Sequence, residues 1–269
     1  MNNDRKQLSW RAESARNLAM RNLLVATLLV SFVSGAISIR AENPKVLIYT
    51  RNGPTLDGKK GYVHDNIASC VAMLQQLGKD NSFDSDVADK PEVFTDANLK
   101  QYRAIIFANS NNQAFTSEDQ KAAFQKFVRG GGGIVGIHSS CASERNWPWF
   151  WAMMGGTFVR HPKFQPFTIN VLDRKHPSTT HLGATWEWED EFYFLKEMPK
   201  DLHILVEGDL TKLKDPKKDP NEKSRPLSWC HEFEGGRVWF TALGHKKEHY
   251  SDPNLQKHIL GGIRWVMNK

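Results

Sequence analysis

The segment GGGGIVGIHSS, residues 130–140, contains a short apolar strand between a glycine-rich turn and a polar sequence. Residues 134–137 are apolar throughout, as expected of a strand that is buried on both faces of a parallel sheet. His138 and two serines follow its carboxyl end, which is the edge at which open parallel sheets bind ligands. The segment therefore predicts an α/β fold and also the position of its site.

The same alternation of buried strands and amphipathic helices continues on both sides of this segment. Strand–helix–strand units of this kind join parallel strands through right-handed crossovers, so the pattern favours a mostly parallel sheet. We expect one domain over residues 44–269. Its predicted strands cover residues 45–50, 104–109, 134–137, 167–172, 202–206, 227–233 and 237–241, and its predicted helices begin near residues 64, 117 and 253.

The first 36 residues have the features of an export signal. Basic residues precede an apolar run from Leu23 to Ile39, and the small residues Ser34 and Ala36 suit the two key places of a cleavage site after Ala36. The run also approaches the length of a membrane span, so an uncleaved anchor is the alternative. We therefore expect a periplasmic or extracellular protein, or one that is held at a membrane by this segment alone.

Charge and cysteine content argue against several other classes of protein. Five of the 36 basic and two of the 30 acidic residues lie in the leader, so the rest of the chain carries only +3. The lysine-rich run Leu210–Pro226 includes acidic residues and no aromatic ring, which indicates a solvated loop and no nucleic-acid partner. Cys70, Cys141 and Cys230 form no CxxC pair, and we expect them to be structural thiols.

His138 and His245 are the first candidates for chemistry. Each follows a predicted strand near a glycine, and the carboxyl ends of parallel strands share one edge of a sheet, so we expect the two rings to meet. Imidazole is the usual general base near neutral pH and the commonest metal ligand. No HExxH or similar tight spacing is present, so the sequence leaves a divalent metal open. We expect His64 and His161 to line the same pocket as ligand-binding residues.

The segment EWEDEFYF, residues 187–194, supplies acidic partners among aromatic rings. A carboxylate in such surroundings can act as an acid or bind sugar hydroxyls, so Asp190 and Glu191 are both candidate catalytic groups. An ordinary edge strand with exposed acids is the alternative. Tyr193 and Trp149 are candidate ligand contacts, although packing over the sheet explains the Trp149 ring equally well.

Taken together, several segments resemble the ThuA-like family, which is linked with trehalose utilisation. The resemblance implies a fold similar to class I glutamine amidotransferases, a flavodoxin-like three-layer sandwich with helices on both faces of the sheet. His138 stands where those relatives carry a nucleophilic cysteine, so glutaminase activity is not implied. The resemblance covers about residues 44–267, and its ordered segments are KVLIYTRNG, YVH (62–64), YRAIIFANS, GGGIVGIHSS, PWFWAMMGGTFVRHP, HPSTTHLG, EDEFYF and RPLSWCHEFEGGRVWFTALGH.

The family resemblance also implies a function in sugar metabolism. We expect an exported protein that binds or acts on a sugar-derived small molecule, through proton transfer on 3-keto-glycosides in disaccharide utilisation. His138 or His245 would move the proton, with Asp190 or Glu191 as the partner. The alternatives are a non-catalytic carbohydrate-binding or scaffold protein and a metal-dependent hydrolase of another substrate class. The lysine-rich insertion, residues 212–223, lies outside the family pattern, and the sequence gives neither its role nor the oligomeric state.

Overall fold

The computed structural model describes residues 42–268. The export signal that the sequence predicts over residues 1–36 therefore lies outside the described residues. Contacts divide the chain into two units, and the unit from Asn43 to Lys269 holds every described helix and strand. Within the described range, the longest apolar helices fall short of what a membrane crossing requires.

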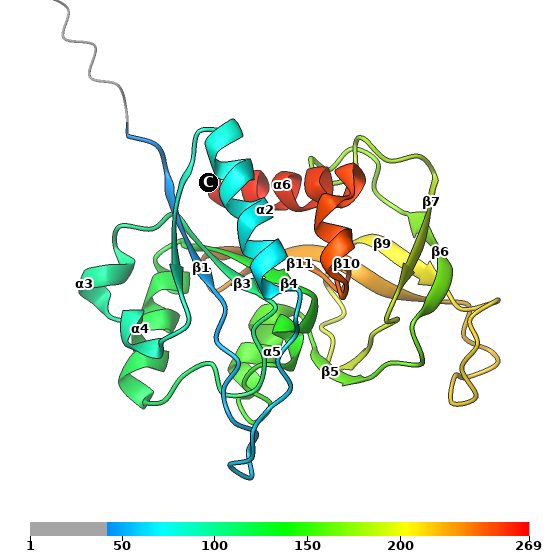
Figure 1. Ribbon diagram of the computed structural model, residues 1–269, viewed down its shortest axis with the longest axis horizontal. Coiled ribbons are helices and arrows are strands. Elements are labelled where there is room, and N and C mark those ends of the chain that lie inside the picture. The colour runs from blue at the N-terminus through cyan, green and yellow to red at the C-terminus, as the bar shows by residue number, and fades with distance from the viewer. Residues whose placement is uncertain (1–41, 269) are drawn as a thin grey trace, which may run out of the picture. The chain divides into compact units, whose positions relative to one another are not determined.

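A nine-stranded sheet in the order β2-β1-β3-β4-β11-β10-β9-β6-β7 forms the centre of this unit (Figure 1). Its first five strands pair in parallel throughout, and their order is that of flavodoxin-like sheets. The predicted α/β, flavodoxin-like fold is confirmed. The bounds of these strands are Asp84–Ala88 for β2, Lys45–Tyr49 for β1, Ala104–Ala108 for β3, Gly133–Ile137 for β4 and Gly236–Thr241 for β11.

The other four strands of the large sheet are antiparallel to their neighbours. Because direction alternates from β11 onward, the last strand, β7, again runs in the same direction as the parallel strands. Its carboxyl end therefore faces the same edge as the residues that follow β4 and β11. The bounds are Ser224–Phe233 for β10, His203–Asp209 for β9, Gln165–Val171 for β6 and Thr185–Asp190 for β7, while β5 (Thr157–Arg160) and β8 (Phe194–Lys196) form a separate pair.

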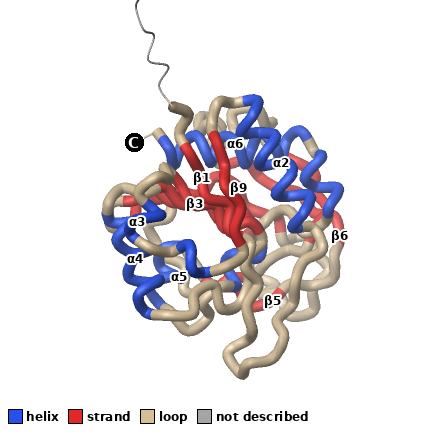
Figure 2. The backbone as a smooth tube through the Cα atoms, turned by 60° about the vertical axis from the view of Figure 1, so that its left-hand side comes forward, coloured by secondary structure: helices blue, strands red, loops and turns tan. Residues whose placement is uncertain are grey.

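Helices cover both faces of the sheet and complete the three layers. The helices α2 and α6 pack together on one face, and α3, α4 and α5 lie on the opposite face, as Figures 1 and 2 show from two directions. Three short 3₁₀ turns cover Pro91–Val93, His138–Ala142 and Lys247–Ser251. The helix bounds are Ile67–Asp80 for α2, Asp96–Leu99 for α3, Glu118–Arg129 for α4, Pro148–Met154 for α5 and Pro253–Met267 for α6.

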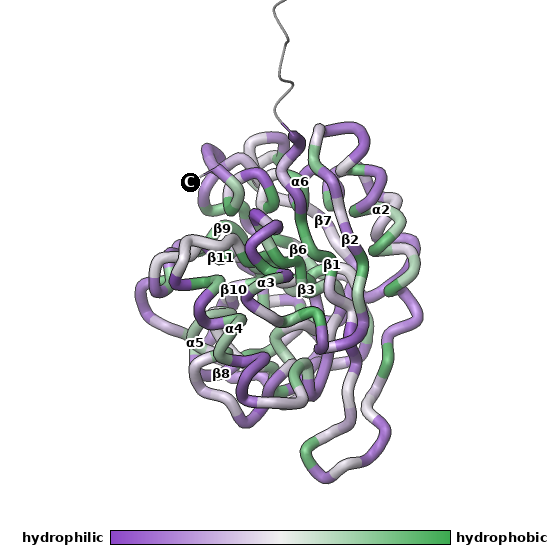
Figure 3. The backbone as a smooth tube through the Cα atoms, turned by 90° about the vertical axis from the view of Figure 1, so that its left-hand side faces the viewer, coloured by the Kyte–Doolittle hydropathy of each residue, from purple (hydrophilic) through white to green (hydrophobic). Residues whose placement is uncertain are grey.

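Apolar side chains fill the space between these layers. In Figure 3 the hydrophobic colour gathers along the central strands, and hydrophilic segments lie on the outside of the helices and loops. Trp229 and Trp239 are fully buried, so both rings belong to the core. A Cβ atom at Gly262 would lie 2.3 Å from the Trp239 ring, which explains a glycine in the middle of α6. Cys70, Cys141 and Cys230 are buried and unpaired, as predicted.

Local signals set several element boundaries. Ser117 caps α4 by accepting a hydrogen bond from the Gln120 N–H, and Asp252 caps α6 in the same way. The β10–β11 hairpin turns at Glu234 and Gly235 with φ values of 45° and 102°, which is the backbone twist that tight hairpins need. The first long helix begins at Ile67 instead of near residue 64, so His64 lies in the loop before it.

His258 of α6 is buried between aromatic rings of the sheet. Its ring centroid lies 4.8 Å from that of Trp239 and 6.0 Å from that of Trp186. Its Nδ1–H donates a 2.8 Å hydrogen bond to the Ser178 carbonyl oxygen, and among the described residues its Nε2 atom has no partner. Burial lowers the pKa of His258 to about 3, so the folded protein holds this imidazole neutral.

This histidine should make the folded state sensitive to mild acid. The unfolded chain binds a proton at His258 below about pH 6.5 and the folded chain does not, so stability falls as the pH drops. In His258→Gln this contribution is absent. We expect the difference in unfolding free energy between wild type and variant to shrink by about 2 kcal/mol from pH 7 to pH 5, measured by urea unfolding. An identical difference at both pH values would contradict the assignment.

Candidate functional site

His138 occupies a strained turn directly after β4. Its φ angle is +50°, which non-glycine residues rarely adopt, and its side chain is fully buried. Nδ1–H donates a 2.7 Å hydrogen bond to the Ala242 carbonyl oxygen, and Nε2 accepts one of 2.8 Å from the Tyr193 hydroxyl. Burial, together with the nearby His64, lowers the pKa of His138 well below its usual value. The ring is therefore a neutral group with a fixed orientation.

Asp190, at the end of β7, joins that strand to the loop after β11. Its fully buried carboxylate accepts hydrogen bonds from the backbone N–H of Gly244 at 2.8 Å and of Glu191 at 2.8 Å, and from the Trp188 indole at 2.9 Å. The N–H of His245 donates a longer one of 3.3 Å. Burial raises the pKa of Asp190, although His249 and these donors oppose the rise. The structure therefore places Asp190 behind the candidate pocket and not in it.

Two asparagines hold the same loop from the opposite side. The Asn66 amide donates hydrogen bonds to the carbonyl oxygens of Gly244 at 2.7 Å and His245 at 2.6 Å. The Asn109 side chain, directly after β3, accepts a 3.2 Å hydrogen bond from the Asn66 amide and donates to the Tyr250 hydroxyl. Neither asparagine is among the site residues predicted from the sequence. The position of Asn109 after a buried strand was an available signal for one of them.

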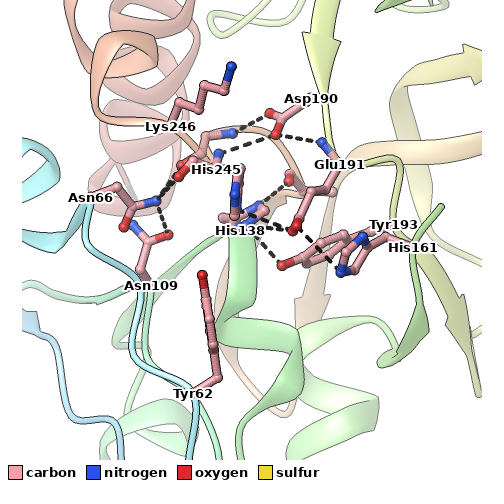
Figure 4. Close-up of polar contacts among 12 residues, drawn as sticks. Tyr62, Asn66, Asn109, His138, His161, Asp190, Glu191, Tyr193, His245 and Lys246 are labelled. Carbon is pink, nitrogen blue, oxygen red and sulfur yellow. Dashed lines mark hydrogen bonds and ion pairs between the residues drawn. The ribbon is translucent and has the colours of Figure 1, made fainter. Parts of the chain in front are cut away.

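The Glu191 carboxylate contacts three imidazole rings, as Figure 4 shows. Its oxygens lie 3.2 Å from His245 Nδ1, 3.4 Å from His161 Nε2 and 3.8 Å from His138 Nε2. Burial alone would raise the pKa of Glu191, but His245 and His161 lower it overall. Burial alone would lower the pKa of His245, and the Glu191 carboxylate raises it overall. The site is thus centred on an ionised carboxylate among imidazoles.

His64 brings a fourth imidazole to the same place. Its buried ring stands edge-on to His138 at 4.9 Å and to His245 at 5.4 Å between centroids. Burial and the neighbouring His245 lower the pKa of His64 to about 4. One side-chain ligand atom from each of His64, His138, His245 and Glu191 lies within 4.8 Å of the others. Of the residues predicted from sequence, the structure brings these four and His161 together.

A pocket of about 740 Å³ opens beside His161. The lysine-rich insertion forms one wall of it through Lys214, Asp215, Pro216 and Lys217, so this segment has a structural place that the sequence did not indicate. The largely buried Asp215 carboxylate lies 2.6 Å from the Arg160 guanidinium and anchors the insertion to β5. His161 Nδ1–H donates to the Pro162 carbonyl oxygen at 2.7 Å, which leaves Nε2 facing Glu191.

The aromatic candidates have different positions. The Tyr193 ring is buried, and its hydroxyl is already used by His138, so it supports the site from below the surface. Tyr62 is 63% exposed and stands edge-on to His64, so a ligand in the site could contact its ring. Tyr62 is not among the ligand residues predicted from the sequence. Trp149 packs against Trp147, Phe124 and Phe233, and the structure does not bring it to the site.

The sequence model of the ThuA family, described as trehalose utilisation, matches residues 45–266. The chain belongs to the ThuA family. The match includes the residues of the imidazole–carboxylate cluster, which are His64, His138, His245 and Glu191. It confirms the family resemblance of the sequence segments. No protein with a curated description matches this ThuA-family chain.

Solved structures of several bacterial proteins show the same fold. A protein described as ThuA-like from Bacteroides uniformis is 23% identical and has a TM-score of 0.68, over 86% of this chain and 95% of the other. A second ThuA-like protein, from Parabacteroides merdae, is 18% identical with a TM-score of 0.67, over 84% and 90%. A cytoplasmic protein from Salmonella typhimurium is 12% identical with a TM-score of 0.53, over 82% and 98%. At these identities the likeness concerns the fold alone.

The role given to Asp190 predicts a large effect on stability. An amide at this position cannot accept the set of N–H bonds that the carboxylate accepts, and buried donors would lose their partners. We expect Asp190→Asn to reduce the unfolding free energy by about 3 kcal/mol in urea unfolding. Glu189→Gln, on the exposed face of the same strand, is the matched control and should change it by less than about 0.5 kcal/mol. Equal effects of the two variants would refute this role.

Proposed function

We propose that this ThuA-family chain acts on a sugar-derived ligand by moving a proton next to a keto group. Membership in the family suggests a role in trehalose utilisation. The observation that supports the chemistry is the contact of the Glu191 carboxylate with three imidazoles, one of which, His161, borders an open pocket. A positioned base and a group that stabilises developing negative charge are what proton abstraction beside a carbonyl requires.

His161 is the best-placed candidate base. Its Nδ1–H is held by the Pro162 carbonyl oxygen, so its Nε2 lone pair is available, and its side chain is 36% exposed. In the proposed step Nε2 takes the proton from the carbon beside the ketone, and the C–H electron pair moves into the enolate. The carbonyl oxygen then carries the charge, and His245 can give it a proton. Glu191 stabilises the resulting imidazolium of His161.

The remaining groups of the site have supporting roles in this proposal. His138 is buried, and both of its ring nitrogens are already hydrogen-bonded, to Ala242 and Tyr193, so we assign it no proton transfer with the ligand. Asp190 positions Glu191 and His245 through their backbone N–H groups. We therefore assign the catalytic carboxylate to Glu191 and not to Asp190. Its partner in the proposed step is His161.

The pocket has the size and the lining for a disaccharide derivative. Its volume of about 740 Å³ lies within the range of small-molecule sites. Arg160, Lys163 and Lys214 offer donors for sugar hydroxyls, and Phe164 offers a ring face. As part of the same proposal we place the reaction outside the cytoplasm, on the sequence of residues 1–36, with a small-molecule partner and no nucleic acid.

Removing the candidate base tests the proposal directly. We expect His161→Gln to reduce kcat on 3-keto-trehalose or a related 3-keto-glycoside by about 100-fold, because the lone pair that takes the proton is lost. His203→Gln is the matched control, since His203 is also an exposed imidazole beside a carboxylate, Asp173, at 2.8 Å. It should keep wild-type turnover. Turnover that is equal in both variants would exclude His161 as the base.

The alternative of a non-catalytic carbohydrate-binding protein gives a different result in the same assay. Binding of the sugar, followed by tryptophan fluorescence, without turnover of any 3-keto-glycoside would favour that alternative. Turnover by the wild-type chain that requires His161 would exclude it.

The lysine-rich insertion should affect binding more than chemistry. Asp215→Ala removes the ion pair that anchors the insertion to Arg160, so the wall of the pocket loses its fixed position. We expect KM for the sugar to rise about ten-fold with kcat changed much less. Asp219→Ala, at an exposed position of the same insertion, should leave both constants unchanged. A fall in kcat with an unchanged KM would contradict this role.

A further inference from the structure

Two buried imidazole nitrogens in the cluster lack ordinary hydrogen-bond partners. Among the described residues, neither His64 Nδ1 nor His245 Nδ1 has a hydrogen-bond partner. His245 Nδ1 lies 3.2 Å from a Glu191 oxygen, but not in hydrogen-bonding geometry. A buried polar atom without a partner is costly, and because His245 Nδ1 is ion-paired with Glu191, His64 Nδ1 is the atom that needs an explanation.

The spacing of the same atoms suits a metal ion. Ligand atoms of His64, His138, His245 and Glu191 all lie within 4.8 Å of one another. The four ligand atoms of a tetrahedral zinc-sized ion are about 3.3 Å apart, since each metal–ligand bond is about 2 Å long. A contraction of at most about 1.5 Å between the most distant pair would therefore close the four groups around one ion.

The surroundings of the cluster hold these groups as a metal site would require. The Nδ1–H of His138 donates to a backbone carbonyl, an arrangement that directs Nε2 inward and that is common for metal-bound histidines. Asp190 and Asn66 fix the backbone of His245 from two sides. The Tyr193 hydroxyl, which now donates to His138 Nε2, must release that atom when the ion binds.

We propose that His64, His138, His245 and Glu191 bind one divalent transition-metal ion. Three imidazoles with one carboxylate favour borderline ions such as Zn²⁺, Fe²⁺, Co²⁺ or Mn²⁺ over Mg²⁺ and Ca²⁺, which prefer oxygen ligands. His161 stays outside the set, because its Nε2 faces Glu191 from the pocket side.

A bound ion would add an electrophile to the proposed reaction, but the metal-site proposal does not depend on that reaction. A divalent cation beside the pocket polarises a carbonyl oxygen, and it would take over the part that a proton on His245 has in the proposed step. Metal binding, however, follows from the cluster alone and can be measured without any sugar.

The test is metal binding by the full chain after treatment with a chelator. Titration with Zn²⁺ in a calorimeter, and with Co²⁺ by its visible absorption, should give one ion per chain. His64→Ala and His245→Ala should each weaken binding by at least about ten-fold, and His161→Gln should leave it unchanged. His203→Ala, which removes an exposed imidazole, is the control for adventitious binding and should also leave it unchanged.

Folding of the variants is checked separately, because His64 is buried. Glu191→Gln keeps the shape of the side chain and should weaken binding in the same way while the circular dichroism spectrum stays that of wild type. A wild-type chain that binds no ion, or equal affinity in wild type and His64→Ala, would overturn the proposal. One bound ion without sugar turnover would support the metal site and remove the proposed function. Turnover that persists in the chelator, with no ion bound by the wild-type chain, would support the proposed function and overturn the metal site.

Discussion

The buried carboxylate of Asp190 is the interaction on which the arrangement of the site depends. A charge without exposure is costly unless hydrogen bonds replace the water it has lost, and here backbone and indole N–H groups do so. Those donors come from two places that are far apart along the sheet, the end of β7 and the loop after β11. The buried carboxylate keeps its hydrogen bonds only while the end of β7 and the loop after β11 lie together. Asp190 therefore connects the antiparallel part of the sheet to the loop that follows its last parallel strand.

This connection explains why the site contains residues from both halves. The parallel strands β4 and β11 deliver His138 and His245, while the antiparallel half and the β5–β8 pair deliver Glu191 and His161. Neither half alone has a carboxylate among imidazoles. The candidate site thus lies at the carboxyl edge of the parallel strands, where open sheets bind ligands, and β7 points to that edge as well.

The fold and the meeting of the two strand-following histidines could be predicted from the sequence. Residues whose roles depend on contacts with distant parts of the chain could not. The convergence of His138 and His245 follows from their positions after strands. The choice between Asp190 and Glu191 was left open, although the alternation of buried residues in β7, Trp186, Trp188 and Asp190, places the aspartate on the inward face. Asn66 could not be found, because its hydrogen bonds reach a loop almost 180 residues away. β2 lacks the apolar run that predicts a buried strand, because it lies at the edge of the sheet and its polar residues are partly or fully exposed.

The way in which the insertion is attached has a consequence for how this protein can change over evolutionary time. The ion pair of Arg160 with Asp215 and two hydrogen bonds between the Gln165 side chain and the Lys214 backbone anchor a segment that forms one wall of the pocket. This segment contributes no residue to the group of His64, His138, His245 and Glu191. Lengthening, shortening or exchanging that segment would reshape this wall and leave His64, His138, His245 and Glu191 in place. Variation confined to this loop can therefore change the shape of the pocket without any change in the clustered histidines and Glu191.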